Sequence, residues 1–151
     1  MSMLNLRRAA ATVSSAVLLT TGAVVVPAAA EAAAPAAQCY NRNGFPPQKS
    51  GNNIGGTPPK YEYSNSPYIG GRYESCGNTI TVYYGGYTTN TTHYLLNWNS
   101  DRNAWTSQRL KAGERMKWTL NAPGNDYNFQ VRACNNTNCT TWSPMLYVNA
   151  R

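Results

Sequence analysis

Residues 127–134 read Tyr-Asn-Phe-Gln-Val-Arg-Ala-Cys, the clearest secondary-structure signal in the chain. Apolar or aromatic side chains stand at every second position, with polar ones between them. Because successive side chains of a β-strand point to opposite faces, this alternation predicts a half-buried strand. The preceding Pro-Gly-Asn-Asp, residues 123–126, is a strong turn signal. The inward face is expected to hold Tyr127, Phe129, Val131 and Ala133.

Shorter segments on the N-terminal and C-terminal sides show the same alternation. Beyond the N-terminal segment, no stretch has the apolar stripe of an amphipathic helix. Several short strands separated by turn residues are typical of a sandwich, so the sequence predicts an all-β, antiparallel β-sandwich over residues 79–151. The expected strands are 79–84, 93–99, 105–110, 115–120, 127–134 and 145–149, with Ile80, Val82, Tyr84, Tyr94, Leu96 and Trp98 facing the core.

Residues 35–78 form a segment rich in Gly, Pro and Tyr. It contains Pro46-Pro47, Pro58-Pro59 and Gly70-Gly71, and no helix can run through so many Gly and Pro residues. We therefore expect an irregular N-terminal arm, stapled by a disulfide, with one strand around residues 60–64.

The four cysteines are Cys39, Cys76, Cys134 and Cys139. An even count in an exported chain indicates disulfides, and three pairings are formally possible. Only four residues separate Cys134 from Cys139, at an expected hairpin tip, which favours pairing those two and joining Cys39 to Cys76. A zinc site using a cysteine pair and His93 is disfavoured by the wide spacing and the lone histidine.

The N-terminus has the organisation of a secretion signal. Arg7 and Arg8 precede an apolar run over residues 9–26, and small residues follow over 28–37. Thr and Ser interrupt the run, which argues against a membrane anchor, and Gln38 argues against a lipid on Cys39. Residues 1–34 are thus expected to be a signal peptide, cut between residues 30 and 37, and the protein is expected to be secreted and extracellular.

The C-terminal half resembles the end of a fibronectin type III domain. The run from Pro123 to Ala133 and the later Thr-Trp-Ser-Pro at 141–144 carry the resemblance, together with a Tyr-x-Leu-x-Trp pattern at 94–98. It covers about residues 79–149 and implies strands B to G of that fold, with Tyr127 as a tyrosine-corner residue. Leu120 lies one residue further from Pro123 than in the family, and no A strand is evident.

Catalysis is not expected. His93 is the only histidine, and the sequence has no metal motif, phosphate-binding loop or suitably spaced carboxylate pair, so neither an enzyme activity nor a cofactor is predicted. The net charge is +7, but the basic residues are scattered, so we expect no nucleic-acid partner. The basic cluster over residues 109–117 is interpreted as a solvated strand and loop, and the alternative is a binding patch for an acidic glycan or cell-wall polymer.

Binding is the expected role, because the chain holds eleven tyrosines and four tryptophans against two phenylalanines. The resemblance implies that loops 85–92 and 135–141 emerge at one pole. We expect a monomeric, secreted, non-catalytic binding module that recognises an extracellular protein or cell surface. The alternatives are a carbohydrate-binding accessory module, and a small inhibitor of an extracellular hydrolase acting through the Cys134–Cys139 loop. The candidate ligand-binding residues are Tyr87, Asn90, Trp105, Asn136, Asn138 and Trp142.

Overall fold

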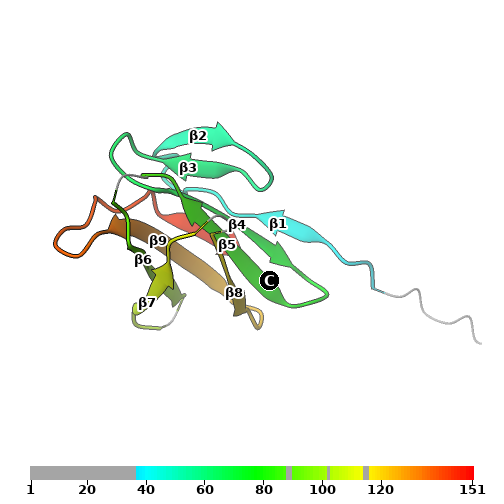
Figure 1. Ribbon diagram of the computed structural model, residues 1–151. Helices are drawn as coiled ribbons and strands as arrows, with labels where there is room; N and C mark the ends of the chain where they lie inside the picture. Colours follow the sequence, from blue (N-terminus) through cyan, green and yellow to red (C-terminus); the bar gives the residue numbers. More distant parts are fainter. Residues whose placement is uncertain (1–36, 88–89, 102, 114–115) are drawn as a thin grey trace, which may run out of the picture. The chain divides into compact units, whose positions relative to one another are not determined.

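The structure is a computed structural model that describes residues 37–87, 90–101, 103–113 and 116–151 (Figure 1). The expected signal peptide, residues 1–34, lies outside the described residues. Within them there are strands and no helix, hence no helix that could cross a membrane. The strands are β1 (Asn41–Asn43), β2 (Asn52–Gly55), β3 (Lys60–Glu62), β4 (Tyr68–Glu74), β5 (Thr79–Gly85), β6 (His93–Ser100), β7 (Thr106–Lys111), β8 (Lys117–Asn121), β9 (Asp126–Cys134) and β10 (Leu146–Asn149).

The described strands form two antiparallel sheets, seen as two layers in Figure 1. The first sheet has the order β2-β3-β4-β5-β8, and the second has the order β10-β9-β6-β7. In the first sheet, β3 pairs with the start of β4 and β1 with its end, so that the two short strands share one edge of β4.

The hydrophobic core lies between the sheets. The first sheet contributes Ile69, Ile80 and Val82, and the second contributes Phe129 and Val131, all fully buried. Burying such a side chain stabilises the fold by about 1.5–3 kcal/mol. The predicted inward faces of 79–84 and 127–134 are therefore confirmed.

Aromatic pairs join the two layers. The rings of Tyr84 and Tyr94 lie 5.1 Å apart, edge to face. Trp98, expected in the core, is only partly buried and packs 6.0 Å from the ring of Trp118. Tyr127 is buried against Trp98 and Phe129, and no hydrogen bond joins its hydroxyl to another described residue, so the tyrosine-corner contact is not found among them.

The expectation of an irregular arm over residues 35–78 is wrong. This segment holds four strands, of which only β3 matches the strand expected around residues 60–64. The longest of them, β4, pairs with β5 along seven residues, although no strand was expected directly before residue 79. Gly70 and Gly71 are extended strand residues that permit close approach rather than ending a strand. A Cβ on Gly70 would lie 2.7 Å from the Pro59 carbonyl oxygen, which leaves no space for a side chain.

The chain before β2 links the two sheets. Asn43 pairs with Arg72 in the first sheet, the Gly44 amide donates to the Gly71 carbonyl at 2.8 Å, and Phe45 pairs with Tyr147 of the second sheet. The 37–45 segment is therefore part of the folded unit.

Both predicted disulfides are confirmed. Cys39 is bonded to Cys76 and Cys134 to Cys139, leaving no free cysteine. The first ties the start of the folded unit to the β4–β5 turn, and the second closes the loop after β9. Disulfides of this kind are compatible with an extracellular protein.

Candidate functional site

Two loops meet at one end of the second sheet and form what we call the loop pole, residues 86–87, 90–92 and 135–140. Between them lies a hollow of about 210 Å³. Three predicted site residues, Tyr87, Asn90 and Asn138, line it together, and the Tyr87 side chain is half exposed. The other lining residues are Thr91, Ala133, Cys134, Asn135, Cys139 and Thr140.

Hydrogen bonds fix the first loop of the pole to the scaffold. The Tyr94 hydroxyl donates to the Gly86 carbonyl at 2.9 Å, and the Thr92 amide donates to the Cys134 carbonyl at 2.9 Å. Between these anchors Tyr87 and Asn90 have φ angles of 65° and 72°. Asn adopts this left-handed region readily, whereas Tyr does so at a cost of about 1 kcal/mol or more. The scaffold therefore holds Tyr87 in a strained backbone conformation, which is a feature of functional loops.

A disulfide and a backbone hydrogen bond close the second loop of the pole. The Cys134–Cys139 disulfide joins the two ends of the loop, and the Asn135 amide donates to the Asn138 carbonyl at 2.9 Å. The Asn135 side-chain oxygen accepts from the amides of Thr137 and Asn138, at 2.9 and 2.7 Å. These bonds constrain the turn, and the Asn138 side chain is exposed at its rim.

The Tyr94 anchor is a protonated phenol at neutral pH. Burial raises the pKa of Tyr94 above its usual value, and nearby Tyr68 and Tyr84 raise it further. The hydroxyl therefore keeps the proton that it donates to Gly86.

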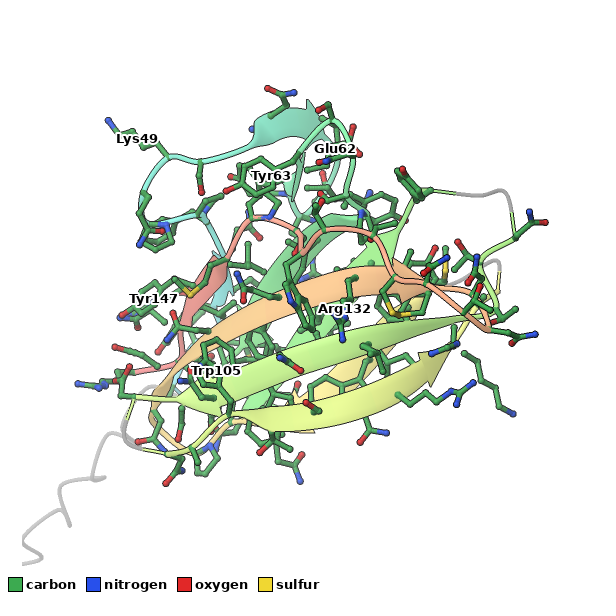
Figure 2. All side chains as sticks on the ribbon, turned by 90° about the vertical axis from the view of Figure 1, so that its left-hand side faces the viewer. Lys49, Glu62, Tyr63, Trp105, Arg132 and Tyr147 are labelled. Carbon is green, nitrogen blue, oxygen red and sulfur yellow. A yellow bond between two sulfur atoms is a disulfide. The ribbon has the colours of Figure 1, made fainter. Side chains whose placement is uncertain are left out.

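The second candidate surface is the outer side of the second sheet, which we call the sheet face. Its side chains are those that point away from the core on β10, β9, β6 and β7. Figure 2 views the molecule from this side and labels Trp105, Arg132 and Tyr147 in front of the strands. The strand register arranges the residues in rows across the sheet: Tyr147, Asn128 and Asn99; then Gln130, Asn97 and Ser107; then Arg132, Leu95 and Arg109; then Cys134, His93 and Lys111.

Arg132 is held by a tryptophan. Its guanidinium carbon lies 4.5 Å from the centre of the Trp142 ring, a cation–π contact. The Arg132 Nε atom is buried and has no hydrogen-bond partner among the described residues. Trp142 thus positions a guanidinium group whose donors are unused within the described part of the chain.

A second basic group lies at the same end of the face. A hollow of about 370 Å³ is lined by Thr92, His93, Arg109, Leu110 and Lys111. The Arg109 guanidinium nitrogen is 3.3 Å from His93 Nδ1. Desolvation, followed by the charge of Arg109, lowers the pKa of His93, so the ring is neutral at pH 7 and the positive charge belongs to Arg109 and Lys111.

The opposite end of the face carries the carboxylates. Asp126 accepts a hydrogen bond of 2.6 Å from the Tyr147 hydroxyl, which is the main cause of the raised pKa of Tyr147. Arg151 forms ion pairs with both Asp126 and Asp101. The single positive charge of Arg151 is therefore shared between these two carboxylates.

The six predicted ligand-binding residues divide between the two surfaces. Asn136 belongs to the 135–138 turn of the loop pole but does not line the hollow. Trp105, which is 48% exposed, and Trp142 lie at the sheet face instead. The amides and Arg132 on that face were not predicted as site residues, although each occupies an outward position of a predicted strand.

The described residues contain no group of three or more His, Cys, Asp or Glu side chains that could hold a metal ion. No protein-family model matches the sequence, and no curated protein matches it significantly.

Proposed function

We propose that this chain is an exported, non-catalytic binding module of fibronectin type III-like topology that recognises an extracellular protein through its loop pole. The strand order supports the topology. Immunoglobulin-like sandwiches place strands A, B and E in one sheet and C, F and G in the other. Here β4-β5-β8 would correspond to A-B-E, and β10-β9-β6-β7 to G-F-C with one further edge strand.

Export is supported by two independent features. The N-terminal sequence has the charged, apolar and small-residue regions of a secretion signal. All four cysteines are paired, which requires an oxidising environment to persist.

The observation that carries the recognition proposal is the meeting of Tyr87, Asn90 and Asn138 around one hollow. Tyrosine offers a large ring at low cost in conformational entropy, and asparagine offers adaptable hydrogen bonds, which is the composition of antibody-like binding loops. The Cys134–Cys139 bond and the Tyr94 and Thr92 hydrogen bonds hold the loops before binding. A preorganised surface loses less entropy on association.

The test is a pull-down from culture medium of the producing organism, using the secreted protein with its disulfides intact. A Tyr87→Ala, Asn138→Ala variant is compared with Tyr63→Ala, a matched control because Tyr63 is 39% exposed and lies outside the pole. We expect a protein retained by wild type and by the control, with affinity reduced at least about tenfold in the double variant.

Two results would contradict the proposal. One is retention of the same protein with equal affinity by the double variant. The other is retention of no protein by correctly folded wild type. Far-ultraviolet circular dichroism of each variant verifies that the fold is intact.

A further inference from the structure

We infer that the sheet face is a second binding site, and that it takes an acidic polysaccharide. Its binding side chains differ from those of the loop pole, because Cys134, where β9 enters the second loop, is the only residue of the four rows that lines the pole hollow. The inference therefore goes beyond the proposed protein recognition and can fail without affecting it.

The register provides an extended surface for a polymer. Neighbouring strands lie about 4.8 Å apart and same-face residues of one strand about 7 Å apart, so four rows span roughly 20 Å. Polar side chains occupy the middle of this span, in the row of Gln130, Asn97 and Ser107. A surface of this length contacts several units of a linear chain at once.

The amides on the face match sugar hydroxyls. An amide offers both a donor and an acceptor, as a hydroxyl does. Ser107 donates to the Asn97 oxygen at 2.7 Å, and Asn128 donates to the Asn99 oxygen at 3.2 Å. These bonds orient the two acceptor amides and leave the amide nitrogens of Asn97 and Asn99 free of partners among the described residues. Preoriented, unused donors are what a hydroxyl-rich ligand requires.

The charges select an anionic polymer. Arg132 and Arg109 flank Leu95 in one row, and Lys111 lies in the next. The ion pairs found among described residues are those of Arg151 with Asp101 and Asp126, at the opposite end. Arg132 and Arg109 thus have no carboxylate partner in the described part of the chain, and a guanidinium group binds a carboxylate through two parallel hydrogen bonds.

The aromatic rings border the face and do not form a central series. Trp142 covers Arg132, Tyr147 packs edge to face on Phe45 at 5.5 Å, and Trp105 precedes β7. Binding of single-stranded nucleic acid uses successive rings on which bases stack, along a continuous basic groove. Amides at the centre and cations at one end favour a carboxylated sugar polymer over a nucleic acid.

The experiment is affinity gel electrophoresis of the secreted protein with three probes. Polygalacturonate is the acidic polymer, its methyl ester is the same backbone without the charge, and oligothymidylate is a polyanion without sugar hydroxyls. Wild type is expected to bind polygalacturonate at least tenfold more tightly than either other probe.

Substitutions test whether the basic and amide side chains of the sheet face bind the polymer. An Arg109→Gln, Arg132→Gln protein is compared with Lys49→Gln, Lys117→Gln, which loses the same charge from exposed positions on other elements. We expect at least tenfold weaker polygalacturonate binding in the first and less than twofold change in the second. Asn97→Leu, which keeps all charges, is expected to weaken polygalacturonate binding at least threefold.

Several outcomes would overturn the inference. They are equal loss in the two double variants, equal or tighter binding of the methyl ester or of oligothymidylate, and undiminished binding by Asn97→Leu. If removing Arg132 unfolds the protein, Arg109→Gln alone serves, because Arg109 is exposed. The Tyr87→Ala, Asn138→Ala protein should bind polygalacturonate as wild type does, which separates this site from the loop pole.

Discussion

Gly71 of β4 lies directly against Leu146 of β10: a Cβ atom at Gly71 would be 2.8 Å from Leu146 Cδ2 and 3.2 Å from Val148 Cγ2. Both of these neighbours are fully buried and cannot move away freely. Gly71→Ala is therefore expected to destabilise the fold by about 1–3 kcal/mol through overpacking. Urea unfolding followed by tryptophan fluorescence measures the change.

The control for this substitution is Gly113→Ala. A Cβ there meets no described atom within 4 Å, so its stability should match wild type within about 0.5 kcal/mol. Equal stability of the two variants would show that the sheets separate easily at Gly71.

Removing the two disulfides should have unequal effects. The Cys39–Cys76 bond closes a loop with a sequence separation of 37, and Cys134–Cys139 one of 5. Loop-closure entropy predicts losses of about 4 and 2 kcal/mol for the respective double Ser variants. Thermal unfolding of both variants checks the order, and a larger loss for the short loop would contradict the entropic account.

Stability should decrease at alkaline pH through the buried tyrosines. Burial raises the pKa of Tyr94, with added contributions from Tyr68 and Tyr84, so the folded state binds this proton more tightly than the unfolded state. The resulting stability is fully present below about pH 10 and is lost as the pH rises through the folded-state pKa. The midpoint of urea unfolding, measured from pH 8 to 11.5, should fall less steeply in Tyr94→Phe than in wild type. Parallel curves would exclude Tyr94 as a contributor.

The contact between Arg132 and Trp142 should appear as an energetic coupling. Their separation of 4.5 Å is that of a cation–π pair, with an expected coupling of about 0.5–1 kcal/mol. A double-mutant cycle of Arg132→Ala and Trp142→Ala, followed by thermal unfolding, measures it. Strict additivity of the two substitutions would mean that Trp142 does not position the guanidinium group.

Much of the fold could be predicted because alternation is a local signal. In residues 79–84 and 127–134, the two-residue alternation of apolar and polar side chains is enough to predict the strand and its core face, since each strand buries one side. The close spacing of Cys134 and Cys139 likewise determined their pairing within a single turn.

The candidate site was predictable only in part. Tyr87, Asn90 and Asn138 stand in loops rich in polar residues, and the order of strands brought those loops together. Trp105 and Trp142 lie at the sheet face and not at the loop pole. Their location could not be predicted, because the direction of a side chain depends on the sheet that its segment joins.

The amino-acid pattern was enough to identify the strand-rich class and the alternate faces, because these follow from neighbours in the chain. It favoured the observed disulfide pairs because Cys134 and Cys139 are close in sequence, which left Cys39 to pair with Cys76. That Gly70 and Gly71 belong to a strand is visible only in the folded protein. A side chain at these positions would collide with Pro59 and Leu146, which come from other segments of the chain. It also decided the sheet face, because Arg132, Leu95 and Arg109 form one row only when three strands pair in register. Long-range pairing places side chains that no local pattern relates.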